Sequence, residues 1–488
     1  MLKQRLFHWH GRGSAAKGLF VALALCTAGL AACKKKPPPP PPVPESPEES
    51  TEGAAATSGS ASPASASSSA PSQGPVATRC RELPQSSPFR IGEVATNRAS
   101  KETDKDKEDA DDAGPDEDDE VPDPYAVELG PAHADADGFV IGALRTLRGQ
   151  SHALLALLAP DAASGKIVDL GAVHGDPDPP LFAAHGKDLI LVAPDSDAGG
   201  GMLKVGLVRD ARGKAELAWG PEISGVRRDS TFALELSGER AFLAYAADSG
   251  GKIRVFGVAI DPGNPKQKLT PEPLTAAGAD VDSPRLARRA GGYWLAVLRA
   301  LDAPKAKPKP APPSDGSTDL AEGDSLLDIG TGRIEVTKLD AQGKSASSAL
   351  VVTVPGARPM SLDLAPAADG GAYVGFRGDD STPGAEGGAL ELVHVKADGS
   401  FEKVTLNGEL EGTGTPSLLV DSADPTKLWL SAAGQNGATW FGRLGEHSTL
   451  APDGLVRGGD LIAARAGHLL LARSNGTAAD LSVVECGE

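Results

Sequence analysis

The chain has 488 residues, of which 48 are Lys or Arg and 66 are Asp or Glu, so its formal net charge is −18 at neutral pH. A protein this acidic repels the phosphates of DNA and RNA, and we therefore expect no nucleic-acid partner. After residue 33, no stretch approaches the ~18 uncharged apolar residues of a membrane-spanning helix, so we predict no span in that part.

The first 32 residues have the features of a secretory signal peptide. The basic side chains of this segment, with no acidic one among them, are Lys3, Arg5, Arg12 and Lys17. An apolar run of about 12 residues follows from 19 to 30, which is too short to span a membrane and typical of a signal peptide. We predict that residues 1–32 are removed. The formal net charge would then change from −18 to −22, because four basic residues are lost.

The residues around the end of this segment, Leu30-Ala31-Ala32-Cys33, resemble the lipobox of bacterial lipoproteins. The resemblance implies that the chain is cut before Cys33, that the thiol and the new N-terminus are acylated, and that this lipid anchor holds the protein to a membrane. The next residue is Lys34 rather than an aspartate that retains a lipoprotein in the inner membrane, so the resemblance favours the outer membrane of the cell envelope. The alternative is a plain secretory signal that ends near a chance cysteine.

Three segments have compositions that cannot form a hydrophobic core. Residues 33–79 contain six consecutive prolines and a Ser/Ala/Gly run, and we expect a disordered tether. Residues 101–124 are acidic, with twelve carboxylates between 101 and 120, and residues 303–324 are rich in Pro and Lys. Because these two segments interrupt foldable sequence, we predict that they are disordered surface loops of one domain, 80–488.

The rest of the chain consists of short apolar runs bounded by Gly, Asp and Pro, a pattern typical of β-strands. A Gly followed by an apolar run recurs at 138, 186, 238, 291, 370 and 467, and a Gly-free version occurs at 426. The period is about 50 residues once the insertion 303–324 is removed, and such a period with about four strands per unit predicts an all-β, seven-bladed β-propeller. A β-sandwich or a β-solenoid is the alternative.

The cysteines indicate how such a ring would close. Cys26 leaves with the signal peptide and Cys33 takes lipid, which leaves Cys80 and Cys486 at the two ends of the folded region. Disulfides persist outside the cytoplasm, so we predict that these two pair, the alternative being two reduced thiols. The last repeat, 460–488, has room for three strands, and Pro88–Val94 is a candidate for the missing fourth.

The sequence contains no G-x-S-x-G, no Walker phosphate-binding loop and no dinucleotide-binding fingerprint after a strand. Two loops have part of a metal-binding pattern: Asp195-Ser-Asp197-Ala-Gly199, which is half of a calcium loop, and His174-Gly-Asp176-Pro-Asp178. Neither completes a ligand set, and the acidic segment 101–124 has no calcium-loop spacing. We therefore assign no catalytic residue, no metal ligand and no cofactor.

The combination of a lipid anchor with this repeat period is similar to outer-membrane propeller lipoproteins, such as the one that serves the barrel-assembly machinery. From the repeat scaffold and the long tether we predict a monomeric, non-enzymatic scaffold that binds a protein or an envelope polymer such as a glycan. Two alternatives stay open. One is a propeller-type hydrolase or lyase acting on glycan or peptide, which perturbed carboxylates at the mouth of the central channel would favour. The other is a metal-dependent binding module that uses the acidic segment.

Overall fold

The computed structural model describes residues 80–84, 88–92, 125–147, 149–175, 177–197, 200–227, 231–264, 266–301, 332–353, 359–378, 390–406, 416–433, 438–444 and 449–487. The predicted signal peptide, Cys33, the tether and the segments 101–124 and 303–324 lie outside these ranges. Every named element in the described residues is a β-strand. None of these residues belongs to a helix long and apolar enough to cross a membrane.

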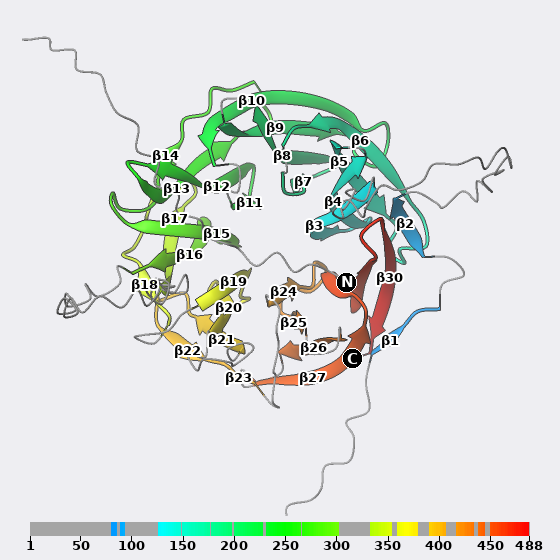
Figure 1. The fold of residues 1–488 in the computed structure, drawn as a ribbon. Helices are drawn as coiled ribbons and strands as arrows, with labels where there is room; N and C mark the ends of the chain where they lie inside the picture. Colours follow the sequence, from blue (N-terminus) through cyan, green and yellow to red (C-terminus); the bar gives the residue numbers. More distant parts are fainter. Residues whose placement is uncertain are drawn as a thin grey trace, which may run out of the picture. The chain divides into compact units, whose positions relative to one another are not determined.

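Seven sheets lie side by side around a common axis as the blades of a β-propeller, which confirms the predicted fold class (Figure 1). The first four blades have four antiparallel strands each. Blade 1 comprises β3 (Tyr125–Asp135), β4 (Gly138–Leu147), β5 (Gln150–Leu158) and β6 (Gly165–Val173). Blade 2 comprises β7 (Leu181–His185), β8 (Asp188–Asp197), β9 (Gly200–Arg209) and β10 (Glu216–Val226). Blade 3 comprises β11 (Phe232–Ser237), β12 (Arg240–Ser249), β13 (Lys252–Ile260) and β14 (Glu272–Pro273). Blade 4 comprises β15 (Asp280–Arg289), β16 (Gly292–Ala300), β17 (Gly332–Asp340) and β18 (Leu350–Val351).

The last three blades complete the ring with small variations. Blade 5 comprises β19 (Pro359–Pro366), β20 (Ala372–Gly378), β21 (Leu390–Val395) and β22 (Phe401–Lys403). Blade 6 comprises β24 (Ser417–Val420), β25 (Leu428–Ala433), β26 (Ala438–Leu444) and β27 (Thr449–Arg457), and β23 (Thr405–Leu406) pairs in parallel with β27. Blade 7 comprises β28 (Asp460–Arg465), β29 (His468–Ser474) and β30 (Ala478–Cys486), with β1 (Cys80–Glu82) and β2 (Phe89–Gly92) on its outer edge.

The apolar runs form strands because both faces of every blade are covered by neighbouring blades. Each of the seven core clusters lies between two adjacent blades. A middle strand such as β12 therefore reads as a continuous apolar run, with buried residues from Ala241 to Ala247. The largest fully buried side chains, Trp294 and Trp429, fill two of these interfaces. The stabilising free energy from buried apolar area, about 25 cal/mol per Å², is therefore spread over all seven interfaces between blades.

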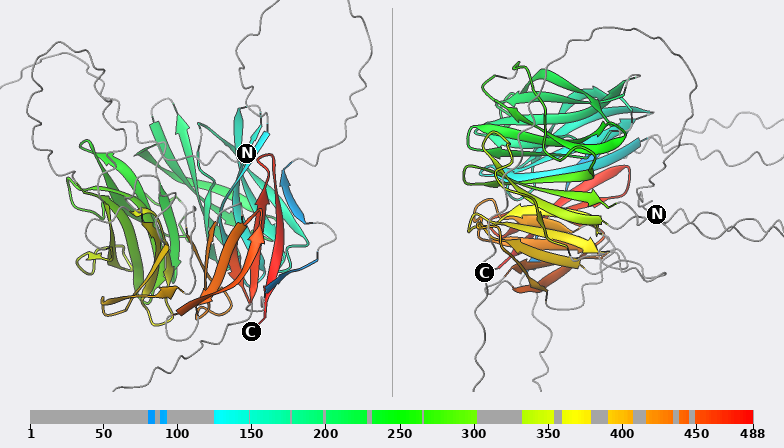
Figure 2. Two further views of the ribbon diagram at one scale, coloured as in Figure 1. Left: turned by 60° about the horizontal axis from the view of Figure 1, so that its bottom comes forward. Right: turned by 90° about the vertical axis from the view of Figure 1, so that its left-hand side faces the viewer.

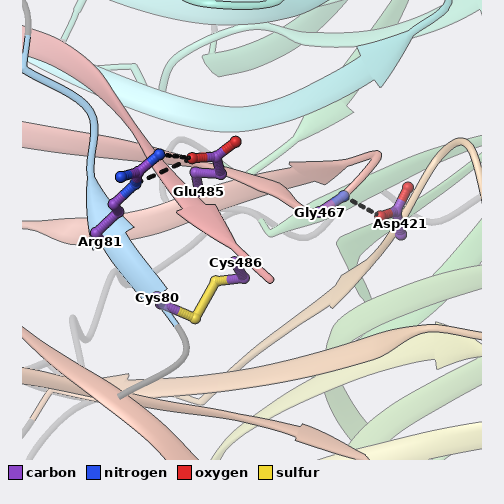
Figure 3. Close-up of a disulfide and its surroundings, with 6 residues drawn as sticks. All are labelled: Cys80, Arg81, Asp421, Gly467, Glu485 and Cys486. Carbon is purple, nitrogen blue, oxygen red and sulfur yellow. Dashed lines mark hydrogen bonds and ion pairs between the residues drawn. A yellow bond between two sulfur atoms is a disulfide. The ribbon is translucent and has the colours of Figure 1, made fainter. Parts of the chain in front are cut away.

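The N-terminal strands close the ring. β2 pairs with β30 from Phe89 opposite Leu481 onward, as the sequence predicts for the missing strand. β1 also pairs with β30, in the register Cys80 opposite Cys486, and this second strand is one that the repeat pattern does not predict. The predicted disulfide links these two cysteines, whose Cα atoms are 4.0 Å apart (Figure 3). The Arg81 side chain adds an ion pair with Glu485 at 2.9 Å.

The first strand of each blade lies nearest the axis, and these inner strands are β3, β7, β11, β15, β19, β24 and β28. Because every blade has the same antiparallel strand order, the turns that follow these strands lie on one face of the disc, which we call the hairpin face; Figure 2 shows the disc from the side. The disulfide lies on this face, because the Cys486 backbone N–H donates to the carbonyl of Gly467 in the β28–β29 turn at 2.9 Å. The chain therefore enters the propeller on the hairpin face at Cys80. It leaves β2 at Gly92, next to Ala478 at the opposite end of β30.

Candidate functional site

Titratable side chains from three inner strands lie near the axis at the hairpin face. His133 of β3, Glu235 of β11 and Arg288 of β15 each lie within two residues of the end of their strand. The positive charge of Arg288 lowers the pKa of both Glu235 and His133, so the three groups share one electrostatic environment. We call these three residues the axial site. Figure 1 shows that their strands approach the axis from three different blades.

Glu235 is the carboxyl group of the axial site, and its pKa is strongly shifted. Its neighbours on β11, Leu234 and Leu236, pack against blade 2, so the alternation of the strand turns Glu235 toward blade 4. Burial among the inner strands raises the pKa of Glu235 to about 7, although Arg288 and the Leu236 N–H, 3.2 Å from Oε1, act in the opposite direction. A carboxyl group with this pKa can take up or release a proton near neutral pH.

His133 is the second titratable group of the axial site. Burial lowers the pKa of its imidazole, Arg288 lowers it further, and Asp135 partly opposes both. The ring is therefore neutral at neutral pH and offers one donor and one acceptor nitrogen. A cation, a carboxyl that titrates near pH 7 and a neutral imidazole on three inner strands can bind a polar ligand, and the carboxyl can also exchange a proton with it.

Other inner-strand carboxylates link blades to one another. Burial raises the pKa of Asp363 on β19, and Arg285 and two backbone N–H groups oppose this rise. One of these N–H groups belongs to Leu418 of blade 6 and lies 2.7 Å from Oδ2 of Asp363. Asp421 of blade 6 is fully buried, and Figure 3 shows its hydrogen bond with the N–H of Gly467 in blade 7, at 2.8 Å. These carboxylates satisfy backbone donors and so fix the spacing of blades.

The structure brings two of the sequence's candidate metal loops together. The Asp195 carboxylate accepts the backbone N–H of His174 at 2.6 Å, and the His174 ring Nδ1 is 3.1 Å from the same oxygen. Burial raises the pKa of Asp195, but an ion pair with Lys204 and the backbone donors outweigh it, and the pKa is lowered overall. The Lys204 ammonium thus holds the place that a cation would take. Asp176 lies outside the described residues.

The described ranges contain no group of three or more His, Cys, Asp or Glu side chains placed to hold a metal ion. The acidic segment 101–124, which the metal-dependent alternative invokes, lies outside those ranges, as does Cys33. Of the residues singled out in the sequence, Cys80 and Cys486 therefore have a described role, which is the disulfide that closes the ring.

Sequence reasoning did not identify the axial site. Two of its residues lie in runs that form strands, Phe232–Ser237 and Asp280–Arg289. A charged residue within such a run is the sequence feature that could have pointed to the site. The signal is incomplete because strand alternation tells which residues share a face, but not which strand lies nearest the axis or how far around the ring its partner lies.

No protein-family model matches the chain, and no curated protein matches its sequence. Among solved structures, a polysaccharide lyase of family PL25, an ulvan lyase, has a TM-score of 0.50 at 8% sequence identity and covers 75% of this chain and 96% of its own. The β-propeller domain of the trilobed protease from Pyrococcus furiosus has a TM-score of 0.42 at 7% identity and covers 74% and 94%. Likeness at such low identity shows the fold alone, and the chain is a seven-bladed β-propeller.

Proposed function

We propose that the protein is a lipid-anchored component of the bacterial cell envelope that uses the hairpin face of its propeller to bind a protein or an envelope polymer. The observation that carries the proposal is the axial site, where three blades place ligand-type side chains on the hairpin face. Binding sites on propeller-like scaffolds are built from several repeats at once, and a rigid ring holds such groups in fixed positions.

The ring closure supports the same proposal. The segment that we predict to be a tether ends at residue 79, directly before Cys80, and Cys80 is disulfide-bonded to the last strand. Because this bond is covalent, a pull on the predicted tether does not separate the strands that close the ring. The predicted tether of 47 residues, 33–79, is long enough to leave the hairpin face accessible.

The two ends of β4 allow a sharp test of the proposed binding face. Asp137, in the turn before β4, is exposed on the hairpin face, and Gln150, just after the turn that follows β4, is exposed on the opposite face. A photoreactive residue is introduced at one position or the other in cells, followed by irradiation and mass spectrometry of the products. We expect a reproducible crosslinked partner or polymer from position 137 and not from 150. Products from 150 alone, or from neither position, would contradict the proposal.

The anchor is tested separately by metabolic labelling with a palmitate analogue. We expect the full chain to take up label and to fractionate with membranes, and Cys33→Ser to lose both properties. A Cys80→Ser/Cys486→Ser variant is the matched control, since it removes two cysteines but leaves the proposed acylation site. Label retained in Cys33→Ser would refute the anchor.

A second candidate function is favoured by one observation, the pKa of about 7 for Glu235 in the axial site. A carboxyl group that titrates near neutral pH can serve as the acid or the base in a hydrolase or lyase acting on glycan or peptide. The test is turnover of a panel of polysaccharides and peptides between pH 5 and 9. An enzyme of this kind must show an ionisation near pH 7 that is lost in Glu235→Gln. Turnover that is unchanged in the variant would exclude Glu235 from the reaction.

A further inference from the structure

A groove of about 420 Å³ lies on the hairpin face between blades 2 and 3, and none of its lining residues belongs to the axial site. Its volume falls within the range of small-molecule sites in proteins. The β7–β8 turn, the β9–β10 turn and the loop after β13 form its walls, and the buried Leu207 side chain lies at its base. The polar residues that line it are His185, Lys187, Asp188, Arg209, Asp210, Lys214 and Glu216.

Three cations in the groove have no charged partner among the described residues. The side chains of Lys187, Arg209 and Lys214 are exposed, and none of them is within ion-pair distance of a described carboxylate. Elsewhere on this face, comparable side chains are paired, for example Arg212 with Asp135 at 2.9 Å. Positive groups that are held close together without partners favour an anionic ligand.

The acidic residues of the groove hold its walls in place. Oδ1 of Asp188 accepts the backbone N–H of Asp210 at 2.8 Å, and Oδ2 of Asp210 accepts the N–H of Lys214 at 3.2 Å. The N–H of Ala211 donates to the carbonyl of Lys187 at 3.0 Å, which ties the two turns together. The groove is therefore preorganised, and its carboxylates keep oxygen atoms that can accept hydrogen bonds from a ligand.

Blade 4 has the same turn with only one of the three cations, Lys344 at the position of Lys214, so the turn itself does not require the other two. The sequence Asp340-Ala-Gln-Gly-Lys344 repeats Asp210-Ala-Arg-Gly-Lys214, and in both turns the Lys N–H donates to the Asp side chain. By strand register, however, Arg209 corresponds to Leu339 and Lys187 to Gly292. The extra positive charges of blade 2 are thus a local addition to a shared turn.

We propose that this groove binds an acidic saccharide, and this inference rests on the proposed function because it names the polymer class that the hairpin face recognises. The carboxylate of a sugar acid would pair with Lys187, Arg209 and Lys214. Its hydroxyl groups would donate to Glu216 and to the free lone pairs of Asp188 and Asp210. An inorganic anion can pair with the cations, but it donates no hydrogen bond to Asp188, Asp210 or Glu216 and is repelled by their negative charges.

The test is calorimetric titration of the full chain, purified in detergent, with tri-galacturonate at low salt. Maltotriose is the neutral probe and inorganic phosphate the simple anion. The variant is Lys187→Ser/Lys214→Ser, and Lys344→Ser is its matched control, because that lysine is exposed in the equivalent turn of blade 4. Circular dichroism confirms that each variant is folded.

We expect tri-galacturonate to bind more tightly than maltotriose or phosphate, and the double variant to bind it about tenfold more weakly, since each charge-assisted hydrogen bond lost has a substantial cost. Lys344→Ser should bind like the wild type. The proposal is wrong if tri-galacturonate does not bind, if phosphate binds equally well, or if the control weakens binding as much as the double variant. If the crosslinks from position 137 persist in the double variant, the hairpin face still binds its partner, but the groove is not where it binds.

Discussion

Replacing Glu235 with Gln should change how the stability of the propeller depends on pH. The pKa of Glu235 is raised from 4.5 to about 7 by burial, so between these values the folded chain binds a proton that the unfolded chain releases. The free energy of unfolding of the wild type therefore falls as pH rises through this window. At 1.36 kcal/mol per pKa unit, the loss specific to Glu235 is about 2.5 kcal/mol between pH 5 and pH 8.

The measurement is urea denaturation of both proteins at several pH values from 5 to 8. Gln keeps the oxygen that accepts the Leu236 N–H, so the variant should differ in charge and not in packing. As pH rises from 5 to 8, we expect the free energy of unfolding of Glu235→Gln to increase by about 2.5 kcal/mol relative to that of the wild type. Glu272→Gln, at an exposed position on β14, should show no such growth. Parallel curves for wild type and Glu235→Gln would refute the burial of this carboxyl.

Three further predictions concern the ring and its axis. Cys80→Ser/Cys486→Ser should lower the free energy of unfolding, by up to about 6 kcal/mol in the chain-entropy model for a separation of 406 residues, and non-reducing urea melts would measure it. Equal midpoints would show that the disulfide contributes nothing. Asp421→Ala removes a fully buried carboxylate that accepts the N–H groups of Ala466 and Gly467 and should cost about 3 kcal/mol, whereas Asp424→Ala, whose side chain is 41% exposed, should cost much less; equal costs would contradict the role of Asp421. Because burial lowers the pKa of His133, the wild type should lose stability as pH falls below 6.5, and His133→Asn should lessen this loss in pH-dependent thermal melts.

The fold could be predicted from the sequence because each blade of a propeller repeats the same pattern of residues along the chain. The recurring Gly and apolar runs mark the β-hairpin of each blade, and the seven predicted units are the seven sheets of the structure. The pairing of Cys80 with Cys486 follows from the number of cysteines and from the strand missing in the last repeat. Each of these inferences uses local patterns or counts, which the sequence contains directly.

The candidate sites could not be predicted because they depend on distances around the ring. Glu235 and His133 are about a hundred residues apart in the chain, and only the closed ring brings both under the influence of Arg288. The short strand β1 is likewise invisible in sequence, since three residues are too few for an alternating pattern. The sequence pattern made His174 and Asp195 candidate metal ligands, but the Asp195 carboxylate forms an ion pair with Lys204 from the next strand.

The position of the disulfide also determines how the propeller would bear a mechanical load. A pull on the chain before residue 80 enters the fold at the first residue pair of β1 and β30, where hydrogen bonds alone would open one after another like a zipper. Each such bond contributes only about 1 kcal/mol. Because the first pair is Cys80 and Cys486, the force passes through a covalent bond into β30 and the pairing of β1 and β2 carries none of it. A protein held by its N-terminus in a moving envelope would keep its ring closed under tension for as long as this bond stays oxidised.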